Sequence, residues 1–376
     1  MKLLEKLVKL KDVLRKIYHK IYLKLFYNHK QDLVKIISHQ IEWKSKAEHE
    51  IEMLKANLSF TWVKAIEHFG STAISDLPAK PIIDIIIGVE NLEQAQEIIS
   101  ILEQLNYNFW EDNPKKDRLF FVKGMPPFGK QRTHHVHVFE VSHYEWFARR
   151  AFRDYLNTYE QVKQQYLNLK QDLALKYKDN REAYTAAKTN FVKNIVQQAA
   201  YHFIQFERLK EPHLSLLLKW LETPHVKAWW DQDIKWSDDL IKEKYGTYID
   251  GYKLENNTKK PMHAFIIQLD SKPIGYIQYY NVYDFAHEDN IPLEGLPKSL
   301  AAFDIFIGEE SFVGKGLGAV IINKILDEHI WPQFQACFVD VESSNIGAIK
   351  AYEKAGFRKI KTLDDGKVIW LLKEKI

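Results

Sequence analysis

Cysteine is almost absent from this chain of 376 residues, which contains one, Cys337. A single thiol excludes an internal disulfide framework and is typical of proteins from a reducing compartment. Cys337 lies in an apolar, strand-like run, so we expect it to be buried and unreactive. The chain also lacks a Gly/Ser-rich linker, internal repeats and low-complexity segments, while 46% of its residues are hydrophobic. This composition is sufficient for two or three folded domains.

Long uninterrupted apolar runs are missing from the N-terminal leader, residues 1–40. Its first 35 residues contain ten Lys or Arg and three Asp or Glu. Apolar residues recur there at three- and four-residue steps, from Leu3 to Leu25, which predicts an amphipathic helix. Lysines interrupt the pattern too often for a secretory signal or a membrane span. Two interpretations stay open, a packing or self-associating helix and a basic helix lying on a membrane surface. With no targeting signal apparent, the sequence predicts a cytoplasmic protein.

Acidic residues predominate in the C-terminal half instead. Residues 206–376 contain 22 basic and 26 acidic side chains, a balance of −4. An acidic surface repels the phosphate backbone of nucleic acids and attracts cationic ligands. We therefore expect this half to act on a small cationic molecule and not on nucleic acid.

The hydrophobic pattern predicts two mixed α/β domains after the leader. The first is residues 41–205, with predicted helices over 44–58 and 92–105, strands over 82–89, 119–122 and 135–141, and long helices from 146 to 205. The second is residues 206–376, with predicted helices over 215–221, 238–249, 319–330 and 345–355, and strands over 264–269, 274–280, 302–307, 336–341 and 367–372. The boundary is predicted near residues 206–212, where the long helices end.

A glycine-spaced turn at residues 313–318, Val-Gly-Lys-Gly-Leu-Gly, joins a predicted strand to a predicted helix. Glycines let the backbone approach a ligand, and the free N–H groups at a helix start bind phosphate oxygens. A second segment, residues 348–357, reads Ala-Ile-Lys-Ala-Tyr-Glu-Lys-Ala-Gly-Phe. In this order and spacing the two segments resemble the acyl-CoA-binding motifs of GNAT N-acetyltransferases. The resemblance implies a GNAT fold for the second domain and acetyl-CoA as its cofactor.

Further segments, at residues 225–230, 273–280 and 303–309, resemble aminoglycoside 6'-N-acetyltransferases, and the similarity covers nearly all of residues 213–372. It implies that Asp304 is the base for the 6'-ammonium and that Tyr352 donates a proton to the departing thiolate. A neighbouring branch that acylates hydroxylysine-type amines in siderophore assembly typically carries His at the position of Asp304. Acylation of such an amine is the alternative. From the residues alone, Asp304 is also compatible with a solvent-facing carboxylate on an edge strand.

The same resemblance implies two sets of binding residues. Those expected to bind the cofactor are Ile305, Ile307, Val313, Gly314, Lys315, Gly316, Leu317, Gly318, Ala319 and Asn345. Val313 stands where GNAT enzymes usually carry Arg or Gln, and Asn345 is also a predicted helix N-cap. Those expected to surround the amine substrate are Trp229, Trp230, Gln278, Tyr280, Asp284 and Asp340.

The middle domain resembles the GrpB-like branch of the nucleotidyltransferase fold at residues 68–73, 79–85, 135–138, 152–156 and 166–177. Nucleotidyl transfer needs two carboxylates on one strand face to hold magnesium. Gly70, Ser71, Asp84 and Glu140 form the possible nucleotide site, but Ile86 stands where the second acid usually lies. We therefore expect a binding or degenerate catalytic module, with Mg²⁺ as a cofactor only if the domain is active.

Histidines at positions 135 and 137 alternate onto one face of a predicted strand in this domain. Histidines at such positions are more often packed or surface residues than ligands, so no metal site is predicted. A different class of function stays open for the whole chain. In it, the second domain senses acyl-CoA while the middle domain modifies a nucleotide or RNA.

Overall fold

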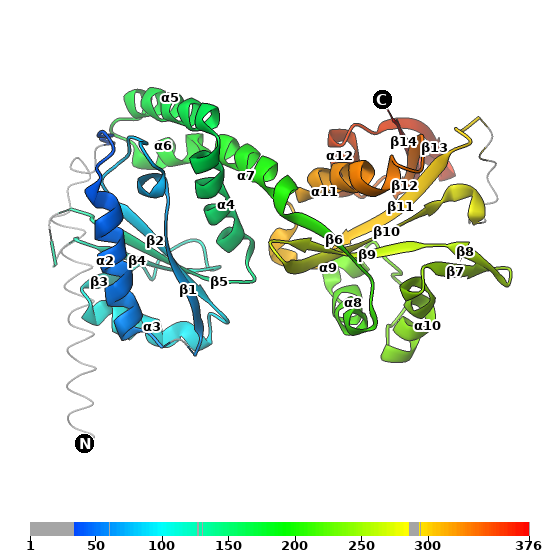
Figure 1. Cartoon of the computed structure of the whole chain (residues 1–376), viewed down its shortest axis with the longest axis horizontal. Helices are drawn as coiled ribbons and strands as arrows, with labels where there is room; N and C mark the ends of the chain where they lie inside the picture. Colours follow the sequence, from blue (N-terminus) through cyan, green and yellow to red (C-terminus); the bar gives the residue numbers. More distant parts are fainter. Residues whose placement is uncertain are drawn as a thin grey trace, which may run out of the picture. The chain divides into compact units, whose positions relative to one another are not determined.

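A computed structural model of the chain describes residues 34–59, 61–125, 128–129, 131–285, 293 and 295–375. The chain divides into two compact units between Val196 and Gln197 (Figure 1). Most of the predicted leader helix, residues 1–33, lies outside the described residues. Within the described ranges, no helix is both long and apolar enough to cross a membrane.

The first unit is built on a five-stranded mixed sheet with the strand order β1-β2-β5-β4-β3. The strands are β1 (Val63–Phe69), β2 (Ile83–Val89), β3 (Tyr107–Phe109), β4 (Leu119–Lys123) and β5 (His134–Glu140). β2 and β5 run parallel, and the other neighbouring strands run antiparallel. The predicted strands that correspond to β2, β4 and β5 are confirmed, whereas β1 and β3 were not predicted.

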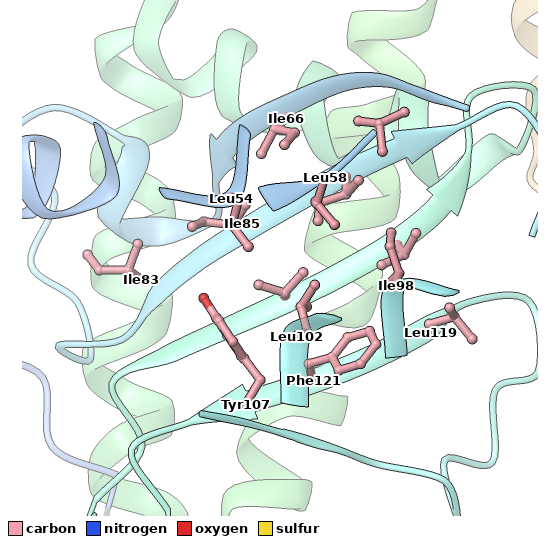
Figure 2. Close-up of a cluster of buried hydrophobic side chains, with 14 of the residues drawn as sticks. Leu54, Leu58, Ile66, Ile83, Ile85, Ile98, Leu102, Tyr107, Leu119 and Phe121 are labelled. Atoms are coloured by element: carbon pink, nitrogen blue, oxygen red, sulfur yellow. The ribbon is translucent and has the colours of Figure 1, made fainter. Parts of the chain in front are cut away.

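One face of this sheet is covered by α2 (Glu42–Asn57) and α3 (Glu97–Gln104). Side chains alternate along a strand, so Ile83 and Ile85 of β2 point into the core on this face. There they join Leu54 of α2, Leu102 of α3 and Phe121 of β4 (Figure 2). The intervening residues of β2 and β5 point to the opposite face, which α4 (Tyr144–Thr158) contacts. Three further helices follow, α5 (Glu160–Lys176), α6 (Arg181–Ala187) and α7 (Thr189–Phe203), and the boundary between the two units lies within α7.

The second unit is built on a seven-stranded sheet with the order β13-β14-β12-β11-β10-β9-β6. Its strands are β6 (Ile204–Arg208), β9 (His263–Leu269), β10 (Lys272–Asn281), β11 (Leu300–Ile307), β12 (Ala336–Glu342), β13 (Arg358–Leu363) and β14 (Val368–Glu374). β11 and β12 run parallel, and the other neighbours are antiparallel. A separate hairpin joins β7 (Tyr252–Glu255) to β8 (Thr258–Pro261).

Helices of the second unit include α8 (Leu214–Leu221), α10 (Asp238–Ile249), α11 (Leu317–Ile325) and α12 (Ile346–Lys354). The four predicted helices are thus confirmed, although α11 passes into a π-helical turn at Leu326–Ile330. Cys337 of β12 is fully buried, and burial raises the pKa of its thiol, as expected for an inert cysteine.

The end of the long helices differs from the prediction. Residues 204 and 205 were expected to be helical, yet α7 ends at Phe203 and residues 204–208 form β6, an edge strand of the second sheet that was not predicted. Ile204 pairs with Leu269 and Arg208 with Phe265, both of β9. Because β6 follows α7 directly, its five residues continue a helical pattern in sequence, and only pairing with β9 makes them a strand. Strands β7, β8 and β13 were also not predicted.

Gly308, directly after β11, is expected to be intolerant of a side chain. A Cβ atom there would lie 2.2 to 2.6 Å from three atoms of the Trp220 indole. Trp220 of α8 is fully buried, and its Nε1 donates a hydrogen bond to Glu309, 2.8 Å away, so the ring has little freedom to move. We expect Gly308→Ala to lower the free energy of unfolding by about 1–3 kcal/mol.

Urea unfolding followed by tryptophan fluorescence measures this effect. Gly246→Ala is the matched control, because Gly246 lies within α10 and a Cβ atom there meets no heavy atom within 4 Å. Alanine at a helix interior position is expected to be neutral or to stabilise by up to about 1 kcal/mol. Equal unfolding free energies for the two variants would show that Trp220 adapts to the added methyl group.

Candidate active site

Two carboxylates stand where β11 and β12 part from each other. The last residues that pair between these parallel strands are Ala302 and Phe338. Asp304 lies two residues beyond this pair on β11, and Asp340 lies two residues beyond it on β12. Since no further β11–β12 pair occurs among the described residues, the backbone edges facing the opening are available to a ligand.

Asp304 is held by a short chain of side-chain hydrogen bonds from β10. Gln278 is paired with Asp304 across the two strands, and its Nε2 donates to Asp304 Oδ2 over 2.8 Å. The other end of the same amide, Oε1, accepts a hydrogen bond from the Tyr276 hydroxyl at 2.7 Å. Tyr276 and Gln278 lie two residues apart on β10, so their side chains share one face of the sheet. This chain sets the orientation of the Asp304 carboxylate.

Burial makes Asp304 an unusually weak acid. Its pKa rises from 3.8 to about 6, first because burial disfavours the charged form and then because of the negative charge of Asp340. The hydrogen bond from Gln278 and the positive charges of Lys244 and Lys253 act in the opposite direction and are outweighed. A carboxylate with a pKa near 6 is mostly ionised at neutral pH and accepts protons readily there.

The charge of Asp304 raises the pKa of tyrosines from three elements, β10, α10 and α12. It is the main cause that raises the pKa of Tyr280 on β10, ahead of burial. Burial and then Asp304 raise the pKa of Tyr352 on α12 above its ordinary value, and they raise that of Tyr248 on α10 to about 12. Tyr352 is buried, and its ring packs against Phe303 with the ring centroids 5.9 Å apart. These phenols stay protonated across the neutral range and are proton donors.

The glycine turn lies at the start of α11 with its backbone in the left-handed region at two positions. Gly314 has a φ of 73° and Gly316, the N-cap, a φ of 81°. A Cβ atom on Gly314 would meet open space, so the conformation and not crowding requires glycine there. Gly318 serves packing instead, because its Cβ would come within 3.1 Å of Ala351 on α12.

Gln197 ties this turn to α12 by two hydrogen bonds. Its Nε2 donates to the Lys315 carbonyl over 3.0 Å, and its Oε1 accepts from Lys354 Nζ at 2.7 Å. Gln197 is buried and lies in the C-terminal part of α7. The sequence patterns did not identify it, because 118 positions separate it from Lys315.

The remaining predicted residues lie in different surroundings. The Asn345 side chain accepts a hydrogen bond from Ala348 N over 3.1 Å, so it caps α12 as predicted. Trp229 is 44% exposed, while Trp230 packs on the core with its ring centroid 5.0 Å from that of Phe306. Asp284 forms an ion pair with Lys260 at 3.3 Å.

The two β11 residues that were predicted to bind the cofactor, Ile305 and Ile307, have different backbone partners. The Ile307 carbonyl lies 3.0 Å from His225 Nε2, whereas Ile305 is paired with Ile277 of β10. Tyr248 and Tyr276, which sequence reasoning did not assign to the site, join it through α10 and through Gln278. Only the spacing of Tyr276 and Gln278 on one strand offered a signal for this.

In the first unit, the structure brings together part of the predicted nucleotide site. A Cβ atom on Gly70 would lie 2.6 Å from Asp84 Oδ2, so this glycine lies directly beside the carboxylate. Asp84 Oδ1 lies 2.9 Å from His135 Nδ1. His135 and His137 are both buried, and together with Asp84 they form a compact group of three potential metal ligands.

Glu140 does not belong to this group, contrary to the prediction. It pairs with Val89, five positions along the strands from the Asp84–His135 pair, which at 3.3 Å per residue is roughly 16 Å. Because Glu140 lies an odd number of positions from His135, its side chain points to the other face of the sheet. There Glu140 Oε1 accepts a hydrogen bond from Leu92 N over 3.0 Å.

Comparisons with known proteins divide the chain in the same way. Residues 33–198 match the family described as GrpB protein, and residues 210–365 match the acetyltransferase (GNAT) domain. The UPF0157 protein PA4798 of Pseudomonas aeruginosa is 38% identical over 172 residues, which are 46% of this chain and 70% of that protein. The glutamate-rich protein GrpB of Alkalihalophilus pseudofirmus is 34% identical over 164 residues, 43% of this chain and 94% of the relative.

A third relative is an acetyltransferase, as is the family that the second unit matches. The aminoglycoside N(6')-acetyltransferase type 1 of Klebsiella pneumoniae is 26% identical over 171 residues, which are 44% of this chain and 81% of that enzyme. The resemblance to GrpB and GNAT proteins that the sequence motifs indicated is thereby confirmed, together with the mixed α/β class of both domains.

Proposed function

Since this chain belongs to the GrpB family and joins its GrpB domain to a GNAT acetyltransferase domain, we propose that it acetylates an amino group of a small cationic molecule, with the 6'-amine of aminoglycosides as the acceptor. The observation that carries the proposal is Asp304, a half-buried carboxylate with a pKa of about 6 at the opening between β11 and β12. The alternative acceptor is another amine, of the hydroxylysine type.

Asp304 and Tyr352 have matching proton-transfer roles in this reaction. An alkylammonium ion must lose a proton before its nitrogen can attack a carbonyl carbon, and the ionised Asp304 accepts that proton. The departing thiolate then needs a proton, and the Tyr352 hydroxyl, whose pKa is raised, donates it. Gln278 keeps the Asp304 carboxylate oriented through both steps.

The residues of the second unit fit acetyl-CoA, which supplies the activated acetyl group as a thioester. The N–H groups at the start of α11, from Gly314 to Ala319, would hold its phosphates, and Lys315 adds positive charge. The open space beside Gly314 leaves room for a ligand against the backbone. The unpaired backbone edges beyond Ala302 and Phe338 would accept the amide groups of the pantetheine arm.

An aminoglycoside suits the acceptor side of the site because it carries several ammonium groups. Asp304 and Asp340 supply negative charge, and Asp340 is exposed. The aromatic rings of Tyr280 and Trp229 offer faces for the ammonium groups and the sugar rings. The similarity to the Klebsiella pneumoniae enzyme supports the same acceptor class.

The test is to incubate the full chain with acetyl-CoA and a panel of aminoglycosides, and to measure the release of free CoA thiol. We expect release with drugs that carry a 6'-amine and none with matched drugs that carry a 6'-hydroxyl. Equal release with both groups would contradict the regiochemistry. No release with any drug, combined with release on hydroxylysine-type amines, would replace the acceptor while leaving acetyl transfer in place.

A further inference from the structure

We propose that the GrpB domain contains a binding site for a divalent transition-metal ion, formed by Asp84 of β2 and by His135 and His137 of β5. This inference is independent of the acetyl-transfer function. The proposed site includes two imidazole ligands. Neither the two-carboxylate pattern for magnesium nor the similarity to other proteins predicts such ligands.

Strand pairing brings the three side chains onto one face of the sheet. β2 and β5 are parallel neighbours, with Asp84 opposite His135 and Ile86 opposite His137. Residues in register on adjacent strands share a face, and so do residues two positions apart on one strand. One carboxylate oxygen and one nitrogen from each ring therefore lie within 4.8 Å of one another. Small side-chain rotations, which move these atoms by roughly an ångström, would bring them to the metal–ligand distances of a bound ion.

Two of the ring nitrogens have no hydrogen-bond partner among the described residues. They are His135 Nε2 and His137 Nδ1, and the two residues are only 9% and 7% exposed. His135 Nδ1 is 2.9 Å from Asp84 Oδ1, which leaves Nε2 as the nitrogen with a free lone pair when Nδ1 carries the proton. A buried polar atom without a partner costs about 1–3 kcal/mol, so one on each histidine of this group points to a ligand. A metal ion would coordinate both.

The surroundings keep both rings neutral and fixed in place. Burial is the main cause that lowers the pKa of His135 and of His137, and neutral imidazole is the form that binds metals. The His137 ring packs against Phe120 and Phe69, with centroid distances of 4.6 and 5.3 Å. Rigid ligands reduce the ordering that metal binding requires.

The ligand set predicts which ions bind. Two imidazoles and one carboxylate favour Zn²⁺, Co²⁺, Fe²⁺ or Ni²⁺ over Mg²⁺, which prefers an all-oxygen shell. Ile86, in place of the second carboxylate, is consistent with this choice, since its neighbour across the strands is His137. Positive charges of Lys80 and Arg149 act on Asp84 and oppose a dication, so we expect an exchangeable ion. The experiment therefore titrates added metal into the protein.

Co²⁺ is the probe, because its visible absorption reports coordination by nitrogen and oxygen. The full chain is treated with chelator, dialysed and titrated with Co²⁺, and Zn²⁺ is then added to displace it. We expect a d–d absorption band that saturates at one equivalent and disappears with Zn²⁺. His135→Gln, His137→Gln and Asp84→Asn are each expected to weaken Co²⁺ binding at least about tenfold.

His134→Gln is the matched control. It lies on the same strand, but its side chain points to the opposite face, where His134 Nε2 is 3.9 Å from Glu50. We expect this variant to bind Co²⁺ as the wild-type chain does. Circular dichroism of each variant establishes that it is folded, and Asp84→Asn, the smallest change in shape, decides the question if the histidine variants do not fold.

Three outcomes would overturn the proposal. The first is a wild-type chain without a saturable band. The second is an unchanged band in the folded Asp84→Asn variant or in the folded double variant that combines His135→Gln and His137→Gln. The third is equal loss in the His134→Gln control, which would assign the band to the opposite face of the sheet.

Discussion

Replacing Asp304 by Asn is expected to lower the rate of acetyl transfer by about 10²–10⁴-fold while making the protein more stable at alkaline pH. The rate falls because Asn cannot accept a proton from the acceptor ammonium. Binding of CoA is expected to be nearly unchanged, since the glycine turn and its ties to Gln197 are untouched. Steady-state thiol release gives the rate, and calorimetry gives CoA affinity.

The stability effect follows from the raised pKa of Asp304. In the unfolded chain this carboxyl ionises near its ordinary pKa of 3.8, but in the folded chain it ionises near 6. The unfolded state therefore releases the proton first, and the folded state loses stability as pH rises from about 4 to 6. The shift of about two pKa units corresponds to roughly 3 kcal/mol at full ionisation. Asn avoids this penalty and still accepts the hydrogen bond from Gln278.

Urea unfolding at two pH values separates these effects. We expect Asp304→Asn to be more stable than the wild type by up to about 3 kcal/mol at pH 8, and close to it at pH 3.5. The wild-type acetylation rate should also fall as pH drops below about 6, because the base becomes protonated. Asp340→Asn is the control for charge, because Asp340 is exposed and a comparable gain in stability is not expected. Loss of CoA binding in Asp304→Asn would instead assign Asp304 a structural role.

Replacing Tyr352 by Phe is expected to give the second large effect, a fall in kcat of about 10²–10⁴-fold. The change removes the hydroxyl that donates to the departing thiolate but keeps the ring that packs on Phe303. The KM for acetyl-CoA and the unfolding free energy should therefore change little. Steady-state kinetics with acetyl-CoA varied at saturating acceptor separate kcat from KM.

Tyr201→Phe is the matched control for this variant. Tyr201 also lies in the second unit, where its hydroxyl donates to Asp327 over 2.9 Å, and it is not part of the site. Its loss should leave kcat at the wild-type value. An unchanged kcat in Tyr352→Phe would remove this hydroxyl from the reaction and leave water as the proton source.

Elements with a strong local pattern were predictable from sequence. The apolar run at residues 82–89 predicted β2, and the pattern over residues 238–249 predicted α10, which the structure shows to be capped by the Ser237 side chain. Short strands were not predictable in this way. β3 has three residues and β6 has five, and each is a strand because of the partner it pairs with.

Sequence alone determined the two families, the glycine turn and the presence of a carboxylate within the apolar strand β11. These are local properties, because a turn conformation and a two-residue alternation depend on neighbouring residues. Tertiary structure decided what surrounds each carboxylate. Gln278 lies beside Asp304 because β10 pairs with β11, and Asp340 lies near it where β11 and β12 separate. His137 lies near Asp84 because β2 and β5 are parallel neighbours. Register between distant strands is set by packing of the whole core, which no local pattern encodes.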